Sequence, residues 1–286
     1  MVNAAKTSRV DIKSWLTTKT FQSVLNAREV GYGELFAWAR EYGFDFVEIR
    51  DFDGRMESGE LQHISDVAVQ NGLHPLLAWD GDDVLSRAGA QNWARHVSVA
   101  GRFPEPRYCR VTLAPRHVMN GGYPENVFRR LEQKLLGLAK TAAADGVLLA
   151  LENSFEQLWP SNEEGVIGFS EAVDRLDSCR ICLDPTNLIV NAAEPRGGIQ
   201  AELQRFIGQY KSSIAYIHLK SSIAGSLQSE LVAHDDVGIA MVVQSFYGEK
   251  PVCVELPDQP DFNTGGARAR QAKRLIESFN RGETFG

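Results

Sequence analysis

Four residues that could bind a metal ion recur at nearly even spacing in the second half of the chain. Glu152, Asp184, His218 and Glu255 each end a short apolar run, and successive members are 32, 34 and 37 residues apart. If each run is a strand of a parallel barrel, the four side chains meet at the mouth formed by the carboxyl ends of the strands. Three carboxylates and one imidazole suit Mn²⁺, Mg²⁺, Co²⁺ or Fe²⁺ better than a structural Zn²⁺. Because clustered carboxylates repel one another, the pattern predicts a bound divalent cation.

The chain around these residues alternates short β-like runs with longer helical stretches, a pattern typical of a parallel sheet with crossover helices. We expect strands over residues 18–24, 44–52, 74–79, 108–114, 147–153, 181–183, 214–220 and 252–256. Helical patterns cover residues 33–42, 61–71, 83–100, 124–144, 169–176, 199–210, 237–247 and 266–279. Eight repeats of about 36 residues predict an α/β protein with one domain, a (β/α)₈ TIM barrel over residues 1–286. An open doubly wound sheet is the structural alternative.

Composition and charge exclude several classes of protein. The 286 residues are 43% hydrophobic and 23% charged, as in ordinary globular domains. The net charge of −7 argues against a protein that binds nucleic acid backbones. No apolar run is long enough to span a membrane, and the first residues contain no apolar stretch of the kind found in signal peptides, so we expect no secretory signal. Cys179 and Cys182 form a CxxC pair, but no second pair completes a zinc site, so we expect a reduced, cytoplasmic protein.

The motifs around the four residues resemble those of a known superfamily. LLALEN, ICLDPTN, YIHLKSS and VCVELP, in this order, are similar to motifs of the xylose isomerase-like TIM barrels, and the Glu, Asp, His, Glu order resembles that of tagatose- or psicose-type ketose 3-epimerases. The resemblance implies an isomerase or epimerase of a small keto-sugar or related polyol carbonyl compound. It also implies one divalent ion, with Mn²⁺ as the expected metal, and a homodimer or homotetramer, with a subunit of a hetero-complex as the alternative.

The resemblance assigns a role to each of the four residues. The metal would polarise the substrate carbonyl, and Glu152 and Glu255 would remove and return a proton on opposite faces of a cis-enediolate. Asp184 and His218 would mainly hold the ion, so the full set of metal ligands is Glu152, Asp184, His218 and Glu255.

Five further residues are candidates for contact with the substrate: Asn187, Lys220, Arg50, Arg110 and Trp159. Asn187 stands where many relatives carry a His, which favours a single metal. Lys220 is retained from the family pattern, although the acid that often follows it is Ser221 here. Each of three candidates also has a structural alternative. Lys220 could lie on the surface, Arg50 could form an internal ion pair with Glu48, and Trp159 could pack against a loop.

Three other functions compete with the isomerase or epimerase. A lyase or dehydratase of the inosose dehydratase or C-glycoside-cleaving type would form the same enolate and then expel a β leaving group. A sugar-binding or assembly subunit without catalysis would need neither Glu152 nor Glu255 for proton transfer. A phosphodiesterase of the endonuclease IV type is disfavoured by Asn187 and by the acidic net charge. No glycine-rich phosphate cradle stands out, so we expect an unphosphorylated substrate.

Overall fold

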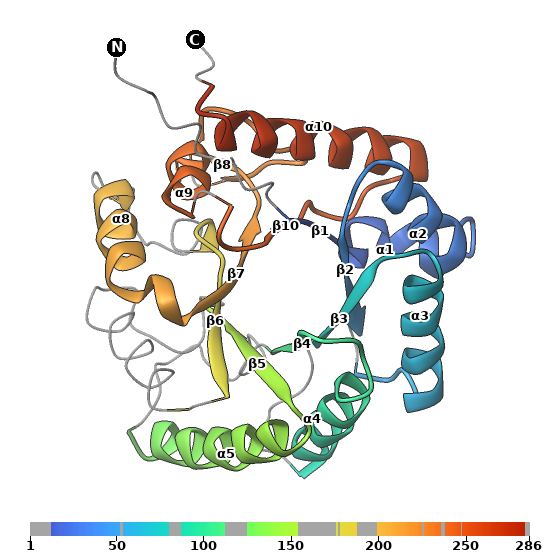
Figure 1. Ribbon diagram of the computed structural model, residues 1–286, viewed down its shortest axis with the longest axis vertical. Helices are drawn as coiled ribbons and strands as arrows, with labels where there is room; N and C mark the ends of the chain where they lie inside the picture. Colours follow the sequence, from blue (N-terminus) through green and yellow to red (C-terminus); the bar gives the residue numbers. More distant parts are fainter. Residues whose placement is uncertain are drawn as a thin grey trace, which may run out of the picture.

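Eight parallel strands close into a barrel in the order β1-β10-β7-β6-β5-β4-β3-β2, with helices around them (Figure 1). The barrel strands are β1 (Ser14–Thr17), β2 (Phe46–Asp51), β3 (His74–Trp79), β4 (Arg107–Val111), β5 (Val147–Glu152), β6 (Cys179–Leu183), β7 (Ile214–Leu219) and β10 (Val252–Val254). The predicted (β/α)₈ barrel is confirmed, and the open doubly wound sheet is excluded. The computed structural model describes residues 13–51, 54–79, 87–111, 125–153, 176, 178–187, 199–224, 226–235, 238–246 and 248–283.

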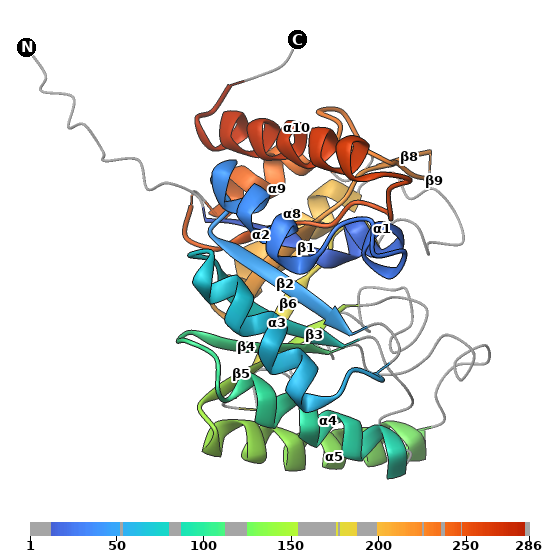
Figure 2. The same ribbon diagram turned by 90° about the vertical axis from the view of Figure 1, so that its right-hand side faces the viewer.

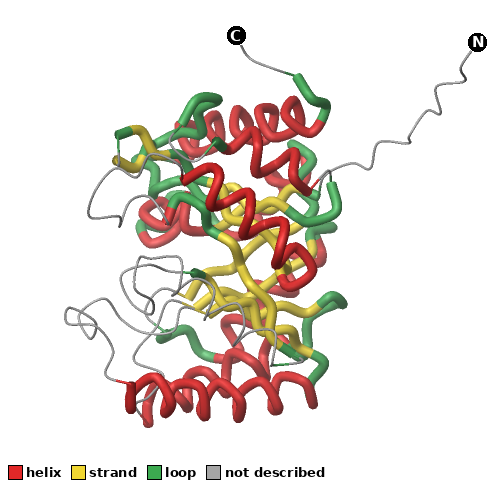
Figure 3. The backbone as a smooth tube through the Cα atoms, turned by 90° about the vertical axis from the view of Figure 1, so that its left-hand side faces the viewer, coloured by secondary structure: helices red, strands yellow, loops and turns green. Residues whose placement is uncertain are grey.

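The helices follow the strands in the alternation that the sequence predicts. They are α1 (Gln22–Asn26), α2 (Tyr32–Glu41), α3 (Ser58–Gln70), α4 (Arg87–Ala100), α5 (Glu125–Ala144), α8 (Ile199–Tyr210), α9 (Ile239–Phe246) and α10 (Phe262–Asn280), with short 3₁₀ turns η1 (Thr18–Phe21) and η3 (Lys211–Ser213). Figure 3 shows the strands enclosed between helices. The expected helix over residues 169–176 lies largely outside the described residues. In the described part of the chain, no helix combines the length and apolarity needed to cross a bilayer.

The first strand lies before the segment that we expected. The prediction over residues 18–24 is wrong, because β1 ends at Thr17, and the chain continues as η1 and α1. The Thr17 side chain accepts a hydrogen bond from the Lys19 backbone N–H at 3.3 Å and so caps this turn. Phe21 and Val24 are buried at a helical spacing of three, not at the spacing of two that a strand requires.

A small aromatic and apolar core fills the inside of the barrel beneath its mouth. Trp15 of β1 lies beside Phe46 and Tyr216, with ring centroids 4.7 and 4.5 Å away. Leu76, Ala150, Cys182, Ala215 and Cys253 complete this cluster. The barrel is therefore a packed core and not a channel, so polar chemistry is confined to the strand ends. The antiparallel hairpin of β8 (Ser222–Ile223) and β9 (Ser226–Leu227) lies on the side to which the arrowhead of β2 points (Figure 2).

Close packing of α10 against η1 depends on a glycine. A Cβ atom on Gly265 would lie 2.7 Å from Cε1 of Phe21, a fully buried ring. We predict that Gly265→Ala lowers the free energy of unfolding by about 1–3 kcal/mol through overpacking, measured by urea denaturation. Gly208→Ala is the matched control, because Gly208 lies in α8 with open space around it. The control should be neutral or stabilising, and equal effects of the two substitutions would contradict the packing argument.

Candidate active site

The structure brings Glu152, Asp184, His218 and Glu255 together at the mouth of the barrel. Glu152 ends β5, His218 lies near the end of β7, and Asp184 and Glu255 directly follow β6 and β10. All four side chains are buried, and one ligand atom from each lies within 4.8 Å of the corresponding atoms of the others. Parallel strands in register produce this convergence, since His218 pairs with Cys253 and Glu152 pairs with Cys182.

The geometry of this cluster fits a divalent ion. Opposite ligands of a Mg²⁺-sized ion lie roughly 4.2 Å apart, twice a metal–oxygen bond of about 2.1 Å. The candidate ligand atoms are at most 4.8 Å apart, so they need to move inward only slightly to bind such an ion. Three buried atoms of the cluster, Asp184 Oδ2, His218 Nδ1 and Glu255 Oε2, make no aligned hydrogen bond in the described part of the chain. They are held by charge contacts instead, because His218 Nδ1 lies 2.5 Å from Glu255 Oε2 and Asp184 Oδ2 lies 2.5 Å from Lys220 Nζ. The spacing of the four residues is therefore the observation that fits an ion.

A second group of donor atoms lies deeper in the barrel. Glu48, His218 and Cys253 also offer atoms within 4.8 Å of one another. Burial raises the pKa of the Cys253 thiol to about 12, so this sulfur is protonated at neutral pH and is a poor ligand. The cluster at the mouth is the better metal site.

Four cationic side chains lie among the carboxylates. Lys19 Nζ and Arg50 Nη1 are 2.5 and 3.0 Å from the same oxygen, Oε1 of Glu255. Lys220 Nζ is 2.5 Å from Oδ2 of Asp184. Arg110 forms a close ion pair through Nη1 with Oε2 of Glu152. We expected the carboxylates to need a metal because they repel one another. That argument is wrong, because cationic side chains of the protein already compensate these negative charges. The evidence for an ion is the geometry of the cluster.

The cations determine the ionisation of the two glutamates. Burial alone would raise the pKa of Glu152, but the positive charge of Arg110 together with the contact to His218 outweighs burial and lowers the pKa. Burial likewise opposes ionisation of Glu255, and Lys19, Lys220 and Arg50 together hold its pKa well below the ordinary value. Both carboxyls are therefore ionised at neutral pH.

Asp184 differs from the two glutamates. Burial raises its pKa, and the nearby Lys220 only partly offsets this shift. Its other oxygen, Oδ1, accepts a hydrogen bond from the Asn187 backbone N–H at 3.1 Å, and its backbone N–H donates to Asn153 Oδ1 at 2.6 Å. These bonds fix the turn that follows β6 and leave Oδ2 facing Lys220 and the cluster.

The residues expected to contact substrate have different outcomes. Arg50, Arg110 and Lys220 are buried and contact the carboxylates, so Lys220 is not a surface lysine. Asn187 Nδ2 donates to Oε1 of Glu152 at 3.4 Å. Trp159 lies outside the described residues. None of these contacts tests substrate binding itself, which stays a prediction.

Two residues of the site were not anticipated in their observed roles. Lys19 was missed because the first strand was misplaced; once β1 ends at Thr17, Lys19 is two residues past a strand end, where side chains reach the mouth. For Glu48 the sequence suggested an ion pair with Arg50 as one alternative, and that contact is long at 3.9 Å. Its nearer partners are His218 Nε2 at 2.8 Å and the Tyr216 hydroxyl at 3.1 Å.

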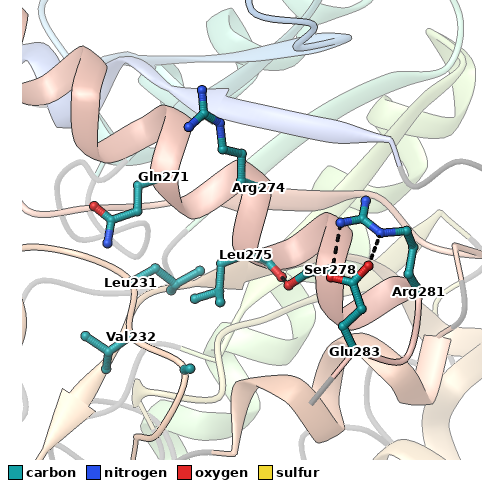
Figure 4. A pocket seen from close by; sticks show the side chains of 9 residues that line it. Leu231, Val232, Gln271, Arg274, Leu275, Ser278, Arg281 and Glu283 are labelled. Atoms are coloured by element: carbon teal, nitrogen blue, oxygen red, sulfur yellow. Dashed lines mark hydrogen bonds and ion pairs between the residues drawn. The ribbon is translucent and has the colours of Figure 1, made fainter. Parts of the chain in front are cut away.

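A surface pocket of about 530 Å³ lies elsewhere, between residues 231–233 and the C-terminal half of α10 (Figure 4). Leu231 and Leu275 face its apolar part, and Arg281 forms an ion pair with Glu283 at its edge, with 2.6 Å between Nε and Oε1. None of the expected site residues lines this pocket.

Comparison with known proteins agrees with the fold. The xylose isomerase-like TIM barrel family matches the chain over residues 36–281. The chain belongs to this family. No curated protein sequence matches the chain.

Solved structures of other proteins resemble this one over most of its length. A structure of L-ribulose 3-epimerase has a TM-score of 0.67 at 16% identity, covering 95% of this chain and 97% of that one. The 3-keto-D-glucoside 4-epimerase from E. coli has a TM-score of 0.67 at 12% identity, covering 94% and 100%. A xylose isomerase-like TIM barrel protein from Mycobacterium smegmatis in complex with magnesium has a TM-score of 0.61 at 14% identity, covering 88% and 91%. At these identities the likeness establishes the fold.

The charge balance of the site predicts the effect of removing one cation. Lys220→Met leaves the buried Asp184 carboxyl without its cation and should lower the free energy of unfolding of the metal-free protein by about 3 kcal/mol. Lys211→Met is the control, because the Lys211–Glu249 ion pair is exposed and contributes less than about 1 kcal/mol. Chemical denaturation in EDTA measures both. Equal losses would show that Lys220 does not compensate a buried charge.

Proposed function

We propose that this protein is a divalent-metal-dependent isomerase or epimerase of a small, unphosphorylated keto-sugar or related polyol carbonyl compound. The observation that carries the proposal is the convergence of Glu152, Asp184, His218 and Glu255, four buried residues whose candidate ligand atoms all lie within 4.8 Å of one another. Family membership and the epimerase names of two similar structures support the same class of reaction.

The four residues would hold one ion. Mn²⁺ is the expected metal for this set of oxygen and nitrogen donors, and Mg²⁺, present in the similar Mycobacterium smegmatis structure, is also suitable. When bound, the ion supplies Lewis acidity, which polarises a substrate carbonyl and acidifies the neighbouring C–H bond. Asp184 and His218 act only as ligands in this scheme.

Glu152 and Glu255 would transfer the proton. Glu152 ends β5, and Glu255 directly follows β10. Because β6 and β7 lie between these two strands in the barrel, the two carboxylates approach a substrate from different sides. One removes a proton from the carbon next to the carbonyl. The other first accepts a proton from a substrate hydroxyl or from solvent and then donates it to the opposite face of the resulting enediolate. Their lowered pKa values keep both ionised and able to accept a proton, but also make them weak bases, so the substrate C–H must be strongly acidified.

The remaining polar groups would orient the substrate. Asn187 and Lys220 stand beside the cluster and can hydrogen-bond to sugar hydroxyls, while Arg50 and Arg110 hold the two glutamates. We keep Trp159 as a candidate for stacking on the sugar.

Proton exchange in D₂O tests the proposal. The Mn²⁺-loaded protein is incubated with a panel of ketoses, inososes and 3-keto-glycosides, the metal is chelated, and NMR spectra are recorded. We expect deuterium at the carbon next to the carbonyl together with a new epimer or isomer. Exchange with release of a leaving group would identify the lyase instead. No exchange with any compound, despite bound metal, would favour a binding subunit.

Two substitutions separate proton transfer from metal binding. Glu152→Gln should retain much of the metal but lower the exchange rate by at least about 100-fold, since it removes a proton-transfer group. His218→Ala should lose the metal itself, measured by elemental analysis after dialysis. A fully active Glu152→Gln variant would show that Glu152 is not a proton-transfer group.

A further inference from the structure

Glu48 is a buried carboxylate with no role in the proton transfer described above. Its side chain is fully buried in β2, below the four-residue cluster. Oε2 accepts hydrogen bonds from His218 Nε2 at 2.8 Å and from the Tyr216 hydroxyl at 3.1 Å. Oε1 accepts one from the Thr17 hydroxyl at 3.1 Å. Both oxygens are therefore fixed, Oε2 by residues of β7 across the barrel and Oε1 by the neighbouring strand β1.

The contact with His218 determines which way the imidazole faces. A ring that donates Nε2–H to a carboxylate is fixed in its rotation and presents Nδ1 on the other side. Nδ1 of His218 lies 2.5 Å from Oε2 of Glu255 and 3.6 Å from Oε1 of Glu152. The atom that would bind a metal is thus directed into the cluster because Glu48 holds the opposite nitrogen.

Glu48 also contacts the two guanidinium groups that hold the glutamates. Oε2 is 3.4 Å from Nε of Arg110, whose Nη1 contacts Glu152. Oε1 is 3.9 Å from Nη1 of Arg50, which is 3.0 Å from Glu255. One carboxylate therefore connects the expected imidazole ligand with the partners of both expected proton-transfer groups.

We propose that Glu48 is the positioning residue of the metal centre, fixing His218 with Nδ1 toward the ion and holding Arg110 and Arg50 in place against Glu152 and Glu255. This inference rests on the proposed function, because it places an ion among the four ligands. Glu48 acts through its neighbours and does not itself contact the ion or the substrate.

The same strand offers a matched control. Asp51 is also buried in β2, three residues further on and therefore on the opposite face. It forms a comparable pair, with Oδ2 2.8 Å from Nε2 of the buried His96 in α4. Asp51→Asn thus breaks a buried carboxylate–imidazole pair outside the barrel interior, and Glu48→Gln breaks one inside it.

Calorimetric titration of the metal-free protein with Mn²⁺ tests the inference without any substrate. We expect Glu48→Gln to raise the Mn²⁺ dissociation constant about 10–100-fold, the usual effect of removing the partner of a ligating histidine. Asp51→Asn should leave the constant within about twofold of wild type, although both substitutions lower the melting temperature. Tyr216→Phe, which removes only one hydrogen bond to Glu48, should weaken binding by about 2–10-fold and keeps the test available if Glu48→Gln does not fold.

Each result of the titration has a distinct meaning. If the wild-type protein binds Mn²⁺ and the Glu48→Gln variant binds it equally well, the positioning role alone is overturned. The Tyr216→Phe variant takes the place of Glu48→Gln if the latter does not fold. Equal weakening by Asp51→Asn also overturns it, because the loss would then be structural. Wild-type protein that binds no Mn²⁺ overturns both the inference and the proposed function.

Discussion

The candidate site depends on one constraint: buried carboxylates remain ionised only when positive charge lies beside them. Among the described residues, the carboxylates of Glu152, Asp184 and Glu255 at the barrel mouth, and of Glu48 below them, lie beside four cationic side chains: Lys19, Arg50, Arg110 and Lys220. The isolated charge of each group would be costly to bury, whereas the interleaved arrangement offsets this cost with ion pairs and hydrogen bonds. A divalent ion would therefore be added to a compensated network and would not be the only source of positive charge in it.

This network is possible because the barrel below it is a solid core. Trp15, Phe46 and Tyr216 fill the interior, so the polar side chains meet in one layer above them. Tyr216 links the two layers, since its ring packs on Trp15 and its hydroxyl donates to Glu48. The position of the chemistry thus follows from the packing as much as from the ligands themselves.

The sequence predicted the barrel and the convergence of four residues because both follow from periodic patterns. Apolar runs of strand length recur with each βα unit, and the residue that ends each run must lie at the mouth. The cationic partners were not predictable in the same way. Lys19 follows β1, a strand of only four residues that does not stand out in the sequence as a long apolar run. Which carboxylate oxygen each cation contacts is set by side-chain packing between strands that are distant in sequence. The role of Glu48 likewise depends on contacts with His218, 170 residues away.

The most direct test of the central claim is the location of a metal in the crystal. Anomalous diffraction from crystals grown with Mn²⁺ shows the ion independently of any assumption about substrate. The structure predicts one anomalous peak within bonding distance of Glu152, Asp184, His218 and Glu255. An empty cluster at saturating Mn²⁺, or a peak bound instead by Glu48 and Cys253, would contradict it.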